Sequence, residues 1–185
     1  SDFNSQLTMV NLLSSFPNVH FYNLTEVSQK FNLEQFTNPY ERQKEFEIGL
    51  NTNPANYVRF VIDKLLPQAT KAMWIDGDVI VRCDLAKMYR KALVENDYIL
   101  SAVPVEKPPM GVNNKALKRN YGNLRISFNA GVYVVDLQRW RKQKIFSKAR
   151  KLALQNRKKQ FYKYGSQPPL VLTIRDQFEH LGWQW

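Results

Sequence analysis

The stretch Lys71-Ala72-Met73-Trp74-Ile75-Asp76-Gly77-Asp78 decides the fold class of this chain of 185 residues. It begins as an apolar run, which is typical of a strand buried on both faces of a sheet in α/β proteins. Two carboxylates follow, one residue apart, where the strand ends. Ligands of open α/β sheets bind at the carboxyl ends of the strands. The stretch therefore predicts a central strand with a candidate site at its end.

Segments of helix and strand character alternate around this strand. Helical spacing predicts helices at residues 55–66, 85–94 and 140–159, the last one basic and amphipathic with Phe146, Ala149 and Ala153 on one face. Further strands are expected at 19–22, 98–103, 132–135 and 170–174, a helix end at 10–13, loops around a short helix at 27–54, and a long loop at 104–127. This alternation predicts one α/β domain with a mixed, mainly parallel sheet flanked by helices.

The composition fits one folded domain with an uneven charge. Hydrophobic residues make up 44% and charged residues 23%, which argues against disorder. Cys83 is the one cysteine, so an internal disulfide and a cysteine-based zinc cluster are excluded. The net charge is +11, and residues 137–175 hold 12 basic residues and no acidic one. Such a charge attracts phosphates, nucleic acid, acidic glycans or an anionic membrane surface, and charge alone does not choose among them.

Asp76 and Asp78 have the chemistry of a metal site. An unpaired carboxylate is costly to bury, and a hard divalent cation such as Mn²⁺ or Mg²⁺ is the natural partner of oxygen ligands. Gly77 between them leaves room for a ligand to approach the backbone. Because two protein ligands do not complete the coordination of such an ion, phosphate oxygens of a nucleotide are expected to complete it.

Two other interpretations stay open at this point. A phosphatase of the haloacid dehalogenase type also carries Asp-x-Asp after an apolar strand, with the first Asp as nucleophile; there Gly-Thr usually follows, whereas Val79-Ile80 follows here. A nucleic-acid-binding module would use residues 137–175, although these show no recognised nucleic-acid motif. A calcium-binding loop is excluded, because apolar side chains stand where polar ligands are needed.

Two blocks of the sequence resemble the signature of glycosyltransferase family 8. The first runs from Tyr57-Val58-Arg59-Phe60 through Leu65-Leu66-Pro67 to residues 71–81. The second is Phe128-Asn129-Ala130-Gly131 with residues 132–137, closed by Arg139-Trp140-Arg141. The resemblance covers roughly residues 10–180. It implies a GT-A (Rossmann-like) fold and a retaining transfer of a hexose or related sugar from a UDP-sugar to a glycan, protein or lipid acceptor, with Mn²⁺ or Mg²⁺.

The resemblance also implies roles for single residues. Asp76 and Asp78 match the metal-binding pair, and Asp76 with Gln167 would be catalytic. Gln167 matches the position beside the reacting sugar carbon, where its carbonyl oxygen would hold a hydroxyl or stabilise an oxocarbenium-like centre. The expected donor-binding residues are Arg59, Lys71, Asp76, Gly77, Asp78, Asn129, Ala130, Ser166 and Gln167. No nucleic-acid partner is expected, and the basic helix is compatible with a position near a membrane.

Three departures from the family pattern qualify this expectation. The family's first strand, which holds the uracil pocket, should precede Ser1. The family's C-terminal His-x-x-Gly-x-x-Lys-Pro-Trp element, whose His completes the metal site, has no match, because His180 does not fit its spacing. Ser166 stands where many members have Asp. Residues 1–185 are therefore expected to form a single, incomplete catalytic domain.

Overall fold

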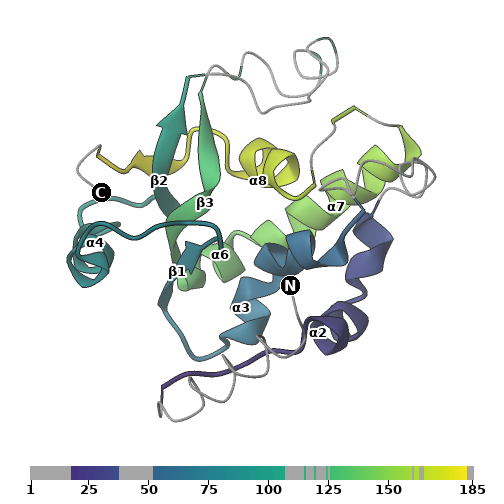
Figure 1. The fold of residues 1–185 in the computed structure, drawn as a ribbon. Coiled ribbons are helices and arrows are strands. Elements are labelled where there is room, and N and C mark those ends of the chain that lie inside the picture. Colours follow the sequence, from purple (N-terminus) through teal and green to yellow (C-terminus); the bar gives the residue numbers. More distant parts are fainter. Residues whose placement is uncertain are drawn as a thin grey trace.

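The computed structural model describes residues 18–37, 52–106, 115, 119, 124, 126–159, 161–162 and 165–182. In these residues helices surround one four-stranded sheet (Figure 1). The strands are β1 (Lys71–Ile75), β2 (Leu100–Val105), β3 (Ser127–Asp136) and β4 (Phe178–His180). The helices are α2 (Leu24–Phe31), η1 (Leu33–Phe36), η2 (Pro54–Val61), α3 (Ile62–Leu65), α4 (Leu85–Lys91), α6 (Leu137–Lys142), α7 (Ile145–Lys158) and α8 (Gln167–Ile174).

The sheet is mixed, as the sequence predicts, and its strand order is β1-β3-β2-β4. Strand β3 runs antiparallel to both β1 and β2, whereas β2 and β4 pair in parallel. Strands β1, β2 and β4 thus share one direction. Because β3 lies between β1 and β2 and runs the opposite way, two of the three described strand pairs are antiparallel, whereas the sequence predicts a mainly parallel sheet. The expected central strand β1 is at the edge of the described sheet, and four of its five residues are only half-buried.

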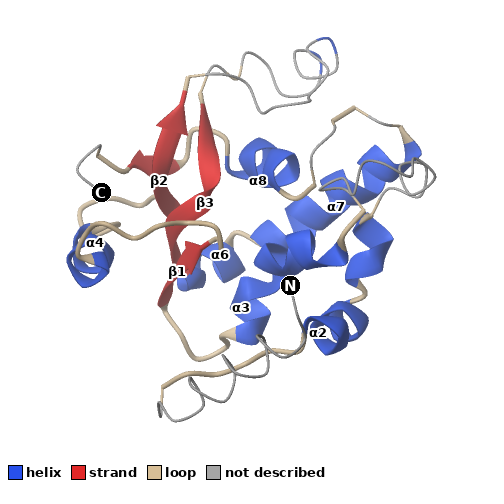
Figure 2. Cartoon of the chain, viewed as in Figure 1, coloured by secondary structure: helices blue, strands red, loops and turns tan. Residues whose placement is uncertain are grey.

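Helices α6, α7 and α8 lie on one side of the sheet, and α4 lies on the other side near one end of the strands (Figure 2). Side chains alternate across a strand, so Ala72 and Trp74 of β1 face the main core, while Met73 faces the other side. The main core contains residues of η2, α6, α7 and α8. On the second face, Met73 and Val134 pack against Ala92 and Leu93, at the end of α4.

Two predicted strands are absent from the structure. Residues 19–22 form no strand, and Asn23 instead caps α2, its side chain accepting from the backbone N–H of Thr25. Residues 170–174 belong to α8, which opens with Pro168 and Pro169 in its first turn. Proline is tolerated there because those N–H groups have no partner within the helix. A short apolar run does not separate a buried helix from a strand, and this one is a buried helix.

The remaining boundaries also differ from the expectation. The helix predicted at 140–159 is two helices, because Asp136 starts α6 as its cap and Lys144 adopts a left-handed conformation (φ 56°) before α7. Ala149 and Ala153 are buried, as predicted. The predicted loop at 104–127 is shortened by β2 and β3. The predicted helix end at 10–13 lies outside the described residues. Of the loops predicted at 27–54, residues 38–51 also lie outside them.

Candidate functional site

The candidate site begins where β1 ends, at a turn of residues 76–79. The backbone N–H of Asp76 donates to the carbonyl of Gly131 at 2.8 Å, which continues the β1–β3 pairing by one residue. The N–H of Val79 then donates to the carbonyl of Asp76 at 3.2 Å and closes the turn. Asp78 and Gly77 are exposed at its tip, and a Cβ on Gly77 would meet no atom within 4 Å. The turn therefore leaves open space around Gly77.

Strand β3 supplies the second part of the site through a bulge. In the antiparallel pairing of β2 and β3, Ala102 lies opposite Tyr133 and Pro104 lies opposite Phe128. Two steps along β2 thus correspond to five along β3, and residues 129–132 of β3 are partly released from pairing with β2. The side chain of Asn129 stabilises this bulge, because its Oδ1 accepts from the N–H of Gly131 at 2.7 Å. Bulges of this kind re-aim backbone groups and are frequent next to active sites. Here the bulge turns the carbonyls of Ala130 and Gly131 towards other parts of the site.

Arg59 joins the bulge to the acidic turn. It lies in η2 and is buried, with 9% of its surface exposed. Its Nη1 donates to the carbonyl of Ala130 at 2.9 Å, and its Nη2 donates to Oδ1 of Asp76 at 3.0 Å. The guanidinium carbon also lies 5.0 Å from the centre of the Trp74 ring. The structure shows that Arg59 pairs with Asp76 and binds the bulge, and its role in donor binding stays a prediction.

The two oxygens of Asp76 have different surroundings. Oδ1 accepts from Arg59 and, at 2.5 Å, from the indole Nε1 of Trp74. None of the described residues donates to Oδ2. A Cβ built on Gly131 would lie 3.2 Å from this Oδ2 and 3.0 Å from Oδ1 of Asn129, so the two oxygens border the same small space. Sequence reasoning did not identify Gly131 or Trp74 as part of the site.

This donor set fits part of the coordination of a hard divalent cation. Oδ2 of Asp76 and the exposed carboxylate of Asp78, two residues apart, are oxygen atoms of the kind that such cations prefer. The positive charge of Arg59 balances Asp76 without using Oδ2. Among the described residues, no group of three or more His, Cys, Asp or Glu side chains could hold a metal ion by itself. A cation at this turn would therefore need further oxygens from a ligand or from water.

Gln167 contacts β3 directly before the bulge. Gln167 is the first residue of α8, and its Nε2 donates to the carbonyl of Phe128 at 3.1 Å, directly before Asn129 in the chain. Ser166 precedes it and is buried. The structure thus brings together Arg59, Asp76, Asn129 and Ala130, whereas Gln167 contacts β3 at Phe128, the residue before Asn129.

Lys71 is separated from this group. It begins β1, whereas Asp76 follows the end of the same strand. Its ammonium group donates to the carbonyl of Ala92 and lies over the ring of Tyr89. Burial lowers the pKa of Lys71, and the nearby carboxylates of Glu179 and Asp136 oppose this shift. The structure does not bring Lys71 to the acidic turn, and its role as a donor ligand stays a prediction.

Tyr133 lies beneath the site and was also missed from the sequence. It is fully buried, it stacks on Trp74 with ring centres 6.2 Å apart, and its hydroxyl has no hydrogen-bond partner in the part of the chain that the structure describes. Burial raises the pKa of Tyr133; Arg59 lowers it and Asp76 raises it further. The pKa of the Tyr133 hydroxyl therefore depends on the charges of Arg59 and Asp76.

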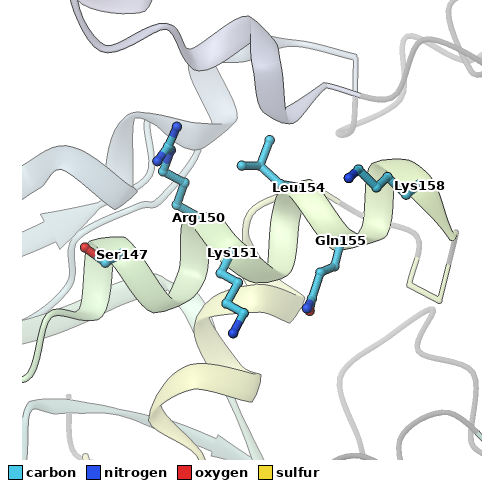
Figure 3. A pocket seen from close by; sticks show the side chains of 6 residues that line it. All are labelled: Ser147, Arg150, Lys151, Leu154, Gln155 and Lys158. Carbon is cyan, nitrogen blue, oxygen red and sulfur yellow. The ribbon is translucent and has the colours of Figure 1, made fainter.

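A separate hollow of about 380 Å³ lies along α7 (Figure 3). It is lined by Ser147, Arg150, Lys151, Leu154, Gln155 and Lys158. Arg150 also donates to the side chain of Gln35 in η1. The hollow contains none of the predicted site residues, so the basic helix is distinct from the acidic turn. None of the described helices is long and apolar enough to cross a membrane.

Comparison with known proteins identifies the family of the chain. The family model described as glycosyl transferase family 8 matches residues 6–185. The chain is 28% identical over 141 residues to the probable galacturonosyltransferase-like 9 of Arabidopsis thaliana, an alignment that covers 72% of this chain and 36% of that protein. The chain thus spans about a third of the length of this curated relative.

Two solved structures share the fold. The bifunctional glycosyltransferase WbbM, in its apo form, superimposes with a TM-score of 0.68 and 19% identity over 100% of this chain and 32% of that chain. The galactosyltransferase LgtC, in complex with donor and acceptor sugar analogues, superimposes with a TM-score of 0.55 and 21% identity over 70% of this chain and 45% of that chain. These likenesses confirm the predicted GT-A fold. With nearly its whole length matched by the family model, the chain belongs to glycosyl transferase family 8.

Proposed function

We propose that this chain is the catalytic part of a retaining glycosyltransferase that uses a divalent cation. It would move a hexose or related sugar from a UDP-sugar to a glycan, protein or lipid acceptor. The observation that carries the proposal is the divided role of Asp76: Oδ1 is paired with Arg59, and Oδ2, to which no described residue donates, lies beside Asn129. The family membership and the solved complex of LgtC with donor and acceptor analogues support this assignment.

The charges at the turn suit a diphosphate. Oδ2 of Asp76 and the carboxylate of Asp78 are the residues that would hold Mn²⁺ or Mg²⁺. When bound, the ion would act as a Lewis acid that stabilises the charge developing on the diphosphate leaving group. Because Arg59 balances one of the two carboxylates, the protein contributes a net charge of about −1 from these three residues. A divalent ion then leaves the group positive, which favours an anionic donor.

The residues along β3 would position the sugar. The bulge and the side chain of Asn129 border the free oxygen of Asp76, so they are the groups closest to a diphosphate held there. Gln167 is fixed by its Nε2, which donates to Phe128. Since an amide is planar, that bond also fixes the direction of its carbonyl oxygen, which could hold a sugar hydroxyl or stabilise positive charge at the reacting carbon. An amide is a poor nucleophile, and no covalent role is assigned to it.

Calorimetric titration with UDP, with and without Mn²⁺, tests the proposal. The wild-type chain should bind UDP more tightly with Mn²⁺, and Asp76→Ala and Asp78→Asn should each remove this gain. Asp176→Asn is the matched control, because Asp176 is an exposed carboxylate between α8 and β4. UDP binding that is unchanged in Asp76→Ala, or a wild-type chain indifferent to Mn²⁺, would refute the proposal. A screen of UDP-sugars for hydrolysis with Mn²⁺ then identifies the donor.

A further inference from the structure

The indole of Trp74 is directed at the carboxylate that the proposed function depends on. Trp74 and Asp76 are two residues apart, and residues at this spacing project to the same side of a strand. The Nε1 of Trp74 donates to Oδ1 of Asp76 at 2.5 Å, and hydrogen bonds to a charged acceptor are stronger than those to a neutral one. The side chain of Asp76 is one-third exposed, so this bond forms at the border between the core and the site.

The position of the indole is itself set by the core. Trp74 is paired across the sheet with Tyr133, and their rings stack with only 6° between their planes. Arg59 lies over the indole ring and binds the same oxygen of Asp76. Tyr133 is fully buried and cannot move away without opening the core. The direction of the indole N–H is therefore fixed before any ligand arrives.

We propose that Trp74 is a positioning residue of the metal site, which fixes Oδ1 of Asp76 so that Oδ2 alone faces the cation. The proposal rests on the proposed function and deepens it. Two donors occupy Oδ1, so a carboxylate that would otherwise rotate or bind through both oxygens presents one oxygen. Partners of this kind, which do not touch the ion, typically change metal affinity by about 10–100-fold. Trp74 itself would not contact the donor.

Trp74→Phe separates the hydrogen bond from the packing, because phenylalanine keeps an aromatic ring but has no N–H group. The matched control is Trp140→Phe, since Trp140 is buried in the core and its Nε1 has no partner among the described residues. Titration of the metal-free chain with Mn²⁺ in the presence of UDP measures the affinity. Trp74→Phe should weaken it by about tenfold, and Trp140→Phe should leave it within about twofold.

A spectroscopic measurement gives a second readout, independent of metal affinity. In a ¹H–¹⁵N spectrum of the metal-free wild-type chain, one indole N–H resonance should lie far downfield, as expected for a donor to a carboxylate, and it should be missing in Trp74→Phe. Addition of Mg²⁺ and UDP should move this resonance, because the ion withdraws electron density from the same carboxylate. If Trp74→Phe fails to fold, the movement of the downfield resonance still decides the question.

The outcomes separate this inference from the proposed function. A wild-type chain that binds Mn²⁺ with UDP, together with an equally tight Trp74→Phe or an indole resonance that Mg²⁺ does not move, would overturn the role of Trp74 alone. A loss of affinity in Trp140→Phe as large as that in Trp74→Phe would also overturn it, since core packing would then explain both. A wild-type chain without Mn²⁺-dependent UDP binding would overturn the proposed function and this inference with it.

Discussion

Replacing Gly131 by alanine should damage the candidate site more than the fold. The new Cβ would lie 3.0 Å from Oδ1 of Asn129 and 3.2 Å from Oδ2 of Asp76, whereas ordinary contacts begin at 3.4 Å. The two oxygens would therefore have to move apart by roughly 0.4 and 0.2 Å. Gly131 has no positive φ; among the described glycines that conformation belongs to Gly165. Crowding of the two oxygens is thus the only direct effect of the substitution.

The expected loss of affinity follows from how small a change in metal–ligand distance a metal site tolerates. Metal–ligand distances are usually kept within about 0.2 Å, so the required displacement of Asp76 reaches this limit. We expect the affinity for UDP with Mn²⁺ to fall about tenfold, which corresponds to ~1.4 kcal/mol. The stability should change less, by about 1 kcal/mol, because Asn129 is exposed and its side chain can rotate away from the new methyl group.

Calorimetry with UDP and Mn²⁺, combined with thermal unfolding, measures both effects. Gly77→Ala controls for stability, since a Cβ there meets nothing within 4 Å and the melting temperature should stay unchanged. If Gly131→Ala binds UDP and Mn²⁺ as tightly as the wild-type chain, the space between Asp76 and Asn129 is not where the ligand is held. If the variant instead loses its fold, the bulge is less adaptable than its exposed asparagine indicates.

Three further predictions concern residues around the site. Tyr133→Phe should stabilise the fold by about 1 kcal/mol in chemical denaturation, because it removes a buried hydroxyl without a described partner. The pKa of Tyr133 is raised above the ordinary 10.0 in the folded chain, so the unfolded chain ionises first as the pH rises. Above about pH 10 the stability of the wild-type chain should therefore fall more steeply than that of the variant. Lys71→Met should leave UDP and Mn²⁺ affinity within about twofold in the same calorimetric assay, because Lys71 lies at the far end of β1; a large loss would mean that donor binding reaches that end. Gln167→Leu keeps the side-chain volume but loses the hydrogen bond to Phe128. It should reduce the rate of UDP-sugar hydrolysis by at least tenfold with little change in UDP affinity. Equal losses of rate and affinity would assign Gln167 to donor binding.

The part of the site predicted from the sequence is the part encoded by local pattern. The apolar run before Asp76 identifies β1, and the family blocks identify Arg59 and Asn129, which the structure brings to the same place. The position of Lys71, at the opposite end of β1 from Asp76, also follows from the sequence. A five-residue strand with a rise of about 3.3 Å per residue separates its first residue from Asp76 by roughly 16 Å.

The contacts that were missed depend on pairing between distant segments. Trp74 meets Tyr133 only because β1 and β3 pair in one register, and Gly131 borders Asp76 only because β3 is bulged there. No local sequence pattern in residues 128–136 predicts that the pairing of β3 with β2 is irregular. The buried helix at α8 was assigned as a strand for a related reason: the apolar run of Leu170–Ile174 has no polar face, so periodicity does not separate the two structures.

The site is best understood as a set of buried polar groups that satisfy one another. The bulge at Asn129 to Gly131 leaves carbonyls that need donors, and Arg59 and the backbone of Asp76 supply them. Arg59 is a buried cation that needs an anion, and Oδ1 of Asp76 is that anion. Removing any one of the three leaves a charge or carbonyl unpaired in the core. The acidic turn and the bulge therefore depend on each other, and among the described residues two groups of this network have no partner: the buried Nε of Arg59 and the partly exposed Oδ2 of Asp76, which is the one that a bound ligand could reach.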